Sequence, residues 1–405
     1  MSNLRVAMVS FHTCPGLAPG AGKVGGMNVY VRELSRNLGA MGMQVDIFTR
    51  RHKGQNQDIV SLGDSVRIVH LDGGPEDAEL EGLYPGVHRF AQRIFDFQAQ
   101  NGIRYDLIHA HYWMSGLVGQ CLSRRDKAPM VMTFHTLAEL KKRARPGEKE
   151  PPYRTAIERQ LLAKADAVTA SSRHEIEAMV NLYQADRNKI RLVYCGVDLS
   201  LFKPLDMKEA RHRLGLNGEK VLLYVGRIEA LKGVDLLLRI AATMEVEDRI
   251  KVLIVGGDLS QDKEVQRLKS LSEEMGVSQR VKFVGRVDRE LLPTYFSAAD
   301  ICVVPSYYES FGLVALESMA CGTPVVAARV GGLPTVVKHG QTGYLLPWRC
   351  PEPYADALSI VLGNEDLRKT MSQAALERAS SMGWDTVASK VGELYNGLVT
   401  ENSSR

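Results

Sequence analysis

The sequence predicts an α/β protein with two doubly wound domains, on the basis of its length, its composition and an alternation of apolar runs with amphipathic stretches. The 405 residues suffice for two domains of ordinary size. Hydrophobic residues make up 45% and charged residues 24%, which excludes disordered, collagen-like and disulfide-rich chains. Short apolar runs that alternate with longer amphipathic stretches are typical of βαβ units around buried parallel sheets.

The apolar runs that we expect to be strands form two series. The first series covers 6–9, 45–48, 107–108, 130–133 and 167–169, and the second covers 221–225, 252–255, 281–284, 301–304 and 325–326. Between the first two runs, apolar residues recur at helical spacing and stop at Gly42, which predicts an amphipathic helix over 27–41 with a glycine exit.

The segment 195–204 separates the two series and places the domain boundary near residue 200. The expected domains are 1–200 and 201–384, followed by a helix of about 385–405 that could pack on either domain. Doubly wound folds bind ligands at the carboxyl ends of their strands, and two facing domains would place these ends along a deep shared cleft. The chemistry is therefore expected in loops that follow strands.

The net charge and the spacing of the cysteines limit the kinds of ligand and the kinds of cysteine site that we expect. The 51 Lys and Arg residues against 47 Asp and Glu residues give a net charge of +4, too small a surplus to indicate a nucleic-acid or membrane surface. The six cysteines form no CxxC pair, so neither a zinc ribbon nor a disulfide framework is indicated. The start lacks a signal-peptide pattern and no apolar run approaches the roughly 20 residues of a spanning helix, so we expect a cytoplasmic protein.

A glycine-rich loop over 15–28 opens into the first expected helix. Its glycines would let backbone amides approach a phosphate at the helix N-terminus, although a flexible surface loop fits the residues equally well. The loop matches neither GxGxxG nor a Walker pattern, so the sequence gives little support to a simple NAD or ATP site.

Charged residues follow two strands of the second series. Arg227 directly follows one strand and Lys232 lies at the entrance of the next helix, where two cations suit a pyrophosphate; a solvated surface pair is the alternative. The segment 305–317 is more specific, because a strand ends in a loop that carries Glu309, small residues start a helix, and Glu317 follows eight positions after Glu309. Glu309 would accept hydrogen bonds from sugar hydroxyls and Glu317 from a ribose, whereas a buried glutamate that caps a helix is the simpler alternative.

His111 and His135 each follow a short strand in the first half, and either could be a structural histidine. The sequence contains no HExxH and no GxSxG pattern. We therefore expect neither a metal site nor a serine nucleophile of the hydrolase type.

Taken together, these motifs resemble the retaining nucleotide-sugar glycosyltransferases of family 4, over nearly the whole chain. The motifs that carry the resemblance are 25–30, 111–113, 135–136, 226–227 with 232–233, 309–312 with Glu317, and 322–327. The resemblance implies the GT-B fold, in which two Rossmann-like domains face each other. It also implies that the N-terminal domain binds the acceptor and the C-terminal domain binds the nucleotide sugar.

The resemblance further implies roles for individual residues. The catalytic residues would be Arg227, Lys232, His135 and Glu309. The donor would be bound by Gly25, Gly26, Arg286, Ser310, Phe311, Gly312, Leu313 and Glu317, and the acceptor by Asn28, His111, Tyr112, Thr136 and Arg154. In this scheme the glycine loop and the two cations hold the diphosphate, Glu317 holds the ribose, and the loop at 285–287 pairs with the base.

Within the family, the segments 25–49 and 109–136 are most similar to the mycothiol-pathway transferases that act on inositol phosphate and to the sucrose-phosphate synthases. Tyr112, Thr136 and Arg154 match three residues that grip the acceptor phosphate there. The lysine of that grip has no match, because the segment 74–84 contains four carboxylates and no cation, and carboxylates repel a phosphate. The basic run 141–145 either compensates for it or is a solvated surface.

The resemblance implies front-face substitution with retention, in which the leaving diphosphate accepts the acceptor proton and cations stabilise its charge. No metal or other cofactor is needed in that scheme. The expected partners are a UDP-linked hexose or N-acetylhexosamine and a small polar acceptor such as a sugar or inositol phosphate; a homodimer is expected by analogy. The alternatives are transfer to a ketose phosphate, as in sucrose-phosphate synthases, a non-catalytic sugar-nucleotide-binding subunit, and a related epimerase or phosphorylase.

Overall fold

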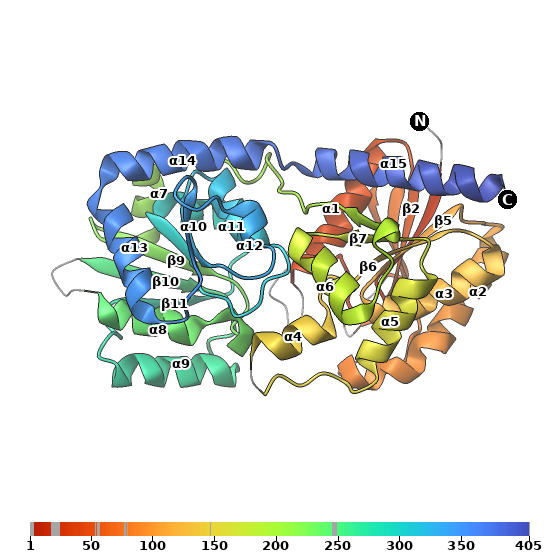
Figure 1. Cartoon of the computed structure of the whole chain (residues 1–405), viewed down its shortest axis with the longest axis horizontal. Helices are drawn as coiled ribbons and strands as arrows, with labels where there is room; N and C mark the ends of the chain where they lie inside the picture. Colours follow the sequence, from red (N-terminus) through yellow and green to blue (C-terminus); the bar gives the residue numbers. More distant parts are fainter. Residues whose placement is uncertain are drawn as a thin grey trace. The chain divides into compact units, whose positions relative to one another are not determined.

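The computed structural model describes residues 4–17, 25–52, 54, 57–76, 78, 80–145, 147–244 and 249–404. The chain forms two compact units, of which one comprises Met1–Cys195 with Trp384–Arg405 and the other comprises Gly196–Gly383. The chain therefore leaves the first unit after Cys195 and returns to it with its last helix (Figure 1).

The first unit is built around a sheet whose described part has the strand order β3-β4-β2-β1-β5-β6-β7-β8. Its strands are β1 (Arg5–Val9), β2 (Gln44–Arg50), β3 (Ile59–Gly63), β4 (Val66–Leu71), β5 (Leu107–His111), β6 (Met130–Thr133), β7 (Ala167–Ala170) and β8 (Ile190–Leu192). Only β3 runs antiparallel to its neighbour among these described strands. Val9 pairs with Phe48 on one side and Ala110 on the other, and all three are fully buried, as expected for a strand covered on both faces.

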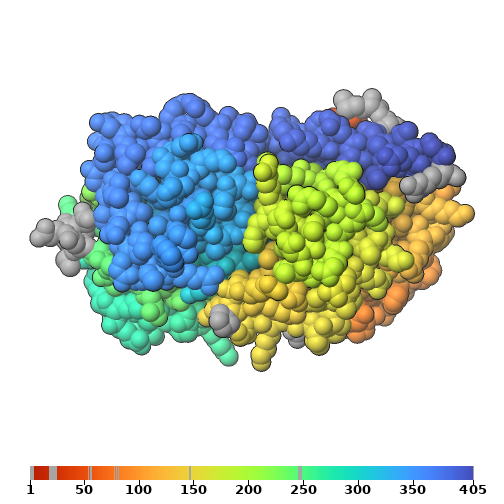
Figure 2. Space-filling view, viewed as in Figure 1, coloured from red at the N-terminus to blue at the C-terminus, as the bar shows by residue number. Residues whose placement is uncertain are grey.

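The helices of the first unit are α1 (Gly26–Ala40), α2 (Val87–Asn101), α3 (Trp113–Asp126), α4 (Ala138–Ala144), α5 (Arg154–Lys164), α6 (Arg173–Tyr183) and α15 (Trp384–Ser403), with short turns η1 (Leu80–Gly86) and η2 (Arg187–Lys189). The helix expected over 27–41 is thus confirmed as α1. Helix α15 packs beside α1, and a Cβ at Gly392 would lie 4.0 Å from Leu38 Cδ2 of that helix. Figure 2 shows α15 in dark blue on the surface of the first unit.

The second unit is built around a parallel sheet whose described strands have the order β11-β10-β9-β12-β13-β14. The strands are β9 (Lys220–Val225), β10 (Ile250–Val255), β11 (Val281–Gly285), β12 (Ile301–Val304), β13 (Val325–Ala328) and β14 (Gly343–Leu346). The helices are α7 (Met207–Leu214), α8 (Val234–Thr243), α9 (Lys263–Glu274), α10 (Leu292–Ala298), α11 (Leu313–Ala320), α12 (Leu333–Val336), α13 (Pro351–Gly363) and α14 (Glu365–Ser380), with turns η3 (Ala230–Lys232) and η4 (Arg289–Leu291).

The predicted α/β class with two Rossmann-like parallel-sheet domains is confirmed. The order of the second sheet is that of a dinucleotide-binding fold, with the first strand of the unit near its middle. The sequence analysis did not predict strands β3, β4, β8 and β14, which lie at or next to the edges of their sheets. β8 has three residues and β14 has four, and each residue of β3 is at least partly exposed. In the described ranges, none of the helices combines the length and apolar character needed to cross a membrane.

Candidate active site

The strand order of the second unit determines which of its polar loops are neighbours. The chain moves from β9 outwards to β10 and β11, and then returns to the other side of β9 with β12. The loops that follow β9 and β12 therefore leave the carboxyl ends of two adjacent strands in opposite directions. Open parallel sheets bind ligands at this position. Arg227 and Lys232 follow β9, and Glu309 and Ser310 follow β12, so the sequence motifs of these two strands come together here.

An ion pair joins the two loops. Lys232 Nζ donates to Glu309 Oε2 at 2.6 Å, and the two side chains are 21% and 19% exposed. Arg227 forms a second ion pair with Glu229, which lies two residues further along the same loop. Both predicted phosphate-binding cations are thus placed at the strand ends and oriented by carboxylates.

Glycines allow the backbone of these loops to approach closely. Gly233 has a φ of +68°, and a Cβ there would lie 2.1 Å from the Pro305 carbonyl oxygen, so Lys232 is held against the end of β12. Gly331 has a φ of +52°, and its Cβ would lie 1.8 Å from the Glu309 carbonyl oxygen. Gly332 N–H donates to that oxygen at 3.0 Å. The Gly-Gly pair after β13 therefore fixes the loop that carries Glu309, a role that the sequence analysis missed although such a dipeptide is itself a turn signal.

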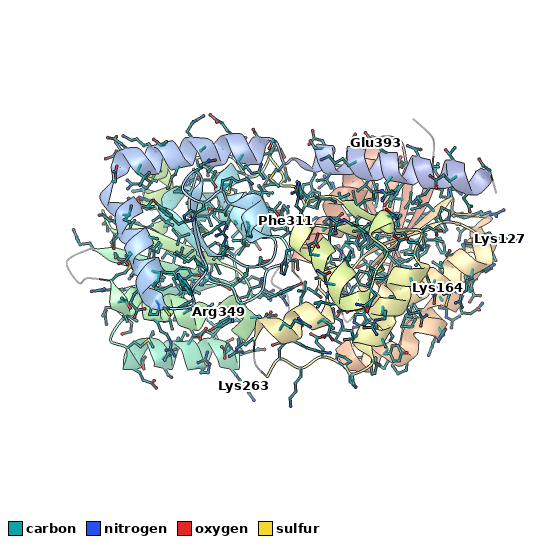
Figure 3. The ribbon with its side chains drawn as sticks, viewed as in Figure 1. Lys127, Lys164, Lys263, Phe311, Arg349 and Glu393 are labelled. Carbon is teal, nitrogen blue, oxygen red and sulfur yellow. The ribbon has the colours of Figure 1, made fainter. Side chains whose placement is uncertain are left out.

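Helix α11 follows the same loop. Gly312 is its N-cap with a φ of +105°, and Leu313 is its first residue. The first amides of a helix have no carbonyl partner within it, so this end favours an anion. Phe311, labelled in Figure 3, is 2% exposed and anchors the turn in the core.

Glu317 lies one to two turns into α11 and is 7% exposed. The Arg289 Nη2 atom lies 3.4 Å from Glu317 Oε1, and the Arg289 guanidinium sits over the Phe202 ring with 5.1 Å between its carbon and the ring centroid. Arg289 thus orients the predicted ribose-binding carboxylate. The sequence analysis missed Arg289 because it lies 28 residues before Glu317 and belongs to no motif.

Arg286 comes from a different place in the sheet. It follows β11, which is separated from β9 by β10. Gly285 has a φ of +84°, and its carbonyl accepts from Gly256 N–H at 2.7 Å, which joins the ends of β10 and β11. Hydrogen bonds from Ser260, and more weakly the charge of Arg286, hold the pKa of Asp258 below its ordinary value.

In the first unit the equivalent reversal lies between β1 and β5. Gly25 is the N-cap of α1, and Gly26 is the first residue of that helix. Asn28 is 2% exposed, and its Nδ2 atom donates to Cys14 O at 2.7 Å and Thr13 Oγ1 at 2.8 Å. Its amide therefore ties the start of α1 to the loop that leaves β1. The part of the glycine loop over 18–24 lies outside the described residues.

Two predicted site residues have an unusual backbone conformation. Among the described non-glycine residues, positive φ occurs at Tyr112, Lys127, His135 and Gln184. Lys127 and Gln184 are left-handed C-caps, which is an ordinary use of that conformation. Tyr112 and His135 instead follow β5 and β6, with φ of +78° and +61°. Non-glycine residues in such conformations cluster at functional sites, where surrounding contacts hold them.

The hydrogen bonds of His111 determine the proton positions of His135. His111 Nε2 lies against the Met8 sulfur, and a thioether can only accept, so His111 carries its proton on Nε2. His111 Nδ1 must then accept from His135 Nε2, which is 2.9 Å away. His135 is then the tautomer with its proton on Nε2.

Burial keeps these imidazoles neutral. Desolvation lowers the pKa of His135 to about 3 and the pKa of His109 to about 3, and it lowers the pKa of His111 well below 6.5. His109 joins the cluster to the last helix, because its Nδ1 atom lies 2.5 Å from the Tyr395 hydroxyl and its Nε2 atom lies 2.7 Å from Thr133 Oγ1.

The three residues predicted to hold an acceptor phosphate are brought together. Arg154 is 1% exposed, its Nη2 atom donates to Thr136 O at 2.8 Å and Thr136 Oγ1 at 3.0 Å, and its guanidinium lies 4.8 Å from the centre of the Tyr112 ring. Glu158 accepts from Arg154 Nε at 2.7 Å, and Glu150 accepts from Nη1 at 2.5 Å. The buried cation is therefore balanced by two carboxylates.

Lys141 belongs to the same network. Its ammonium group pairs with the other oxygen of Glu150, so Glu150 sits between Lys141 and Arg154. The neighbouring Lys142 instead donates to Glu139 at 3.0 Å. Of the basic run 141–145, Lys141 is thus linked to the predicted phosphate grip, whereas the side chains of Asp77, Glu79 and Glu81 in the acidic segment lie outside the described residues.

Two families of known proteins match this chain, one over most of the first unit and one over most of the second. Residues 24–201 match the family described as Glycosyltransferase Family 4, and residues 206–378 match Glycosyl transferases group 1. The chain is 38% identical over 98% of its length to a D-inositol 3-phosphate glycosyltransferase of Corynebacterium efficiens, of which 96% is covered. It is 41% identical over 96% of its length to the Nocardioides protein of the same name, of which 89% is covered. Among solved structures, the sucrose-phosphate synthase of Thermosynechococcus elongatus superimposes with a TM-score of 0.91 at 35% identity, over 98% of this chain and 100% of that one.

The close approach of Gly331 to Glu309 gives a stability prediction. Gly331→Ala and Gly340→Ala both place an alanine at positive φ, but nothing lies within 4 Å of a Cβ at Gly340. Gly340→Ala should cost about 1–2 kcal/mol for its conformation. Gly331→Ala should cost a further roughly 1–3 kcal/mol because the loop must move. Differential scanning calorimetry measures both, and equal transition temperatures for the two variants would contradict the contact.

The buried His109 gives a pH prediction. Its pKa is about 3 in the folded protein and 6.5 in the ordinary state, so between these values the unfolded chain binds more protons and stability falls as pH is lowered. From pH 6 to pH 4 the wild type should lose about 1.4 kcal/mol more per pH unit than His109→Gln. Urea unfolding followed by Trp113 and Trp384 fluorescence in a Trp348→Phe background reports the first unit. Parallel pH curves for the two proteins would show that His109 does not titrate on unfolding.

Proposed function

Because the chain belongs to the family 4 glycosyltransferases, we propose that it transfers a hexosyl or N-acetylhexosaminyl group from a UDP-sugar to a hydroxyl of a small phosphorylated polyol or sugar. That the chain is a glycosyltransferase follows from its relatives over nearly its whole length. The donor, the acceptor and the mechanism are the proposal. The part of the proposal that concerns the sugar donor rests on one observation, the Lys232–Glu309 ion pair at the strand reversal of the second unit.

Arg227, Lys232 and the first amides of α11 suit a nucleoside diphosphate. A diphosphate has more negative charge than the single carboxylates that now face the two cations, so it competes well for both. Release of Glu309 from Lys232 would then leave its carboxylate to accept hydrogen bonds from sugar hydroxyls. Glu317, oriented by Arg289, would accept from the ribose.

We propose transfer with retention by front-face substitution. The bond between the anomeric carbon and the diphosphate oxygen breaks, the acceptor oxygen bonds to the same face, and the acceptor proton passes to the leaving diphosphate. The positive charge for this step comes from Arg227, Lys232 and backbone amides, which are already fixed before the reaction. His135, whose ring position is fixed by its hydrogen bond with His111, would hold the transferred sugar together with Glu309.

The part of the proposal that concerns the acceptor rests on the ion pairs around Arg154. Glu150 presents an anionic group to two cations at once, as a phosphate would, and phosphate exchange for Glu150 would engage both Arg154 and Lys141. Lys141 would thereby supply the cation that the acidic segment 74–84 lacks. The names of the relatives, D-inositol 3-phosphate glycosyltransferase and sucrose-phosphate synthase, both contain a phosphate ester.

Transfer to a ketose phosphate is the second candidate, favoured by the 0.91 TM-score to a sucrose-phosphate synthase. Incubation with UDP-, ADP- and GDP-sugars and with inositol phosphate or fructose phosphate separates the candidates, with nucleoside diphosphate release as the readout. Release that no acceptor stimulates would contradict both.

The donor site predicts the effect of removing one cation. Lys232→Ala should lower kcat/KM by about 10²- to 10³-fold, because it removes a fixed donor to the leaving diphosphate. Lys263→Ala is the matched control, since Lys263 is exposed on α9 of the same unit (Figure 3). Steady-state kinetics with saturating acceptor measures both. Unchanged turnover of a folded Lys232→Ala protein would remove this residue from the site.

The acceptor site predicts different effects for two adjacent lysines. Lys141→Ala should raise KM for inositol phosphate by roughly tenfold to a hundredfold, as expected when one charge-assisted bond worth about 1.5–3 kcal/mol is lost. It should leave KM for unphosphorylated inositol nearly unchanged. Lys142→Ala, which loses only a pair with Glu139, should change neither value. Equal effects of the two substitutions would indicate that the basic run is a solvated surface.

A further inference from the structure

Three potential metal ligands converge in the first unit, and none of them is among the residues assigned to transfer. Cys14 lies in the loop after β1, His52 follows the end of β2, and His70 is in β4 next to Thr49 of β2. These three strands are neighbours in the sheet, in the order β4-β2-β1. Within the described part of the chain, this is the group of metal-binding side chains that comes close enough to hold an ion.

The distances suit a single ion. Cys14 Sγ lies 3.2 Å from His70 Nε2, and the ligand atoms of all three residues lie within 4.8 Å of one another. Two ligands of a tetrahedral zinc ion lie about 3.4–3.6 Å apart, given bonds of about 2.3 Å to sulfur and about 2.0–2.1 Å to nitrogen. The separation of up to 4.8 Å exceeds this spacing, so binding of an ion would require a small movement of the ligand side chains.

Burial raises the pKa of the Cys14 thiol, and hydrogen bonds from the Gly16 and Leu17 amides partly offset this effect. The side chains of Cys14 and His70 are 4% and 1% exposed, which protects a bound ion from solvent. Gly16 N–H points at Cys14 Sγ at 3.4 Å, and His70 N–H donates to Asp58 O at 2.7 Å, which holds the strand that carries the imidazole. Backbone donors to the sulfur and fixed ligand-bearing strands are the outer-shell contacts that tune metal sites.

We propose that Cys14, His52 and His70 bind a zinc ion. One thiolate and two imidazoles are a ligand set that a borderline-soft ion prefers, and a solvent molecule would occupy the fourth position. On binding, the ion replaces the thiol proton of Cys14, which is released to solvent. A zinc ribbon and HExxH were excluded from the sequence, but these three ligands belong to neither pattern because they come from separate strands.

A bound ion would link the loop after β1, which carries Cys14, to His52 and His70. The Cys14 carbonyl accepts from Asn28, so a metal on Cys14 would hold the segment that positions the start of α1. The site is structural in this proposal and takes no part in bond making at the sugar. Its test therefore needs no activity measurement.

The test is metal content of the full chain. Reduced protein is stripped with a chelator, reloaded with zinc chloride, gel-filtered and measured by inductively coupled plasma mass spectrometry. The wild type should retain about one zinc per chain, and Cys14→Ser and His52→Gln should retain at least about tenfold less. Cys121→Ser is the matched control, because Cys121 lies 3.9 Å from one imidazole, that of His88, and should retain zinc like the wild type.

Two further readouts separate metal binding from a simple thiol–imidazole hydrogen bond. Cobalt(II) loading should give a thiolate-to-metal charge-transfer band in the wild type and in Cys121→Ser, but not in Cys14→Ser. Zinc should raise the melting temperature of the wild type but not that of His52→Gln, whose partly exposed site tolerates replacement. A wild type that holds no zinc after gel filtration, or folded Cys14→Ser and His52→Gln proteins that hold as much as the wild type, would overturn the proposal.

Discussion

The parallel arrangement of the strands is the constraint on which the rest of the structure depends. Because helices cover both faces of such a sheet, most residues of its inner strands are apolar, as in β12, where all four residues are buried. The loops at the ends of the strands are therefore the main place for polar side chains that meet a ligand. The reversal of strand order beside β1 and beside β9 separates the loops at those ends. In the second unit the catalytic candidates lie in these loops, and in the first unit His135 follows β6, one strand beyond β5.

Close backbone approach is the second requirement, because loops that diverge must still be held rigid. Gly233 and Gly331 let two chains meet at distances that a Cβ forbids, and the strained Tyr112 and His135 are held by packing and hydrogen bonds. Strain of this kind costs of order 1–3 kcal/mol per residue, which the fully buried strands of the first unit can offset. Rigid loops keep the side chains of the site in fixed geometry.

The sequence alone predicted the fold class, most strands and the loops that carry the site, because apolar runs and glycine-rich or charged motifs are local signals. It did not predict Arg289 beside Glu317 or Lys141 beside Arg154, since both contacts depend on tertiary packing. The sequence did not predict the cluster of Cys14, His52 and His70 for the same reason, since Cys14 and His70 are 56 residues apart. Local motifs thus identified the candidate site residues, whereas the residues that contact and orient these candidates became visible only in the structure.

One pattern unites the cations of the two units. Arg227, Lys232 and Arg154 each face a carboxylate, from Glu229, Glu309 and Glu150. A phosphate group that binds any of them must exchange with that carboxylate, so the net gain is the difference between two ion pairs. This exchange lowers affinity but spares the protein the cost of an isolated charge, which is highest for the buried Arg154. Such an exchange would favour ligands with more than one negative charge. In a chain with a net charge of only +4, selectivity for the proposed phosphorylated substrates would therefore come from local pairing and not from overall charge.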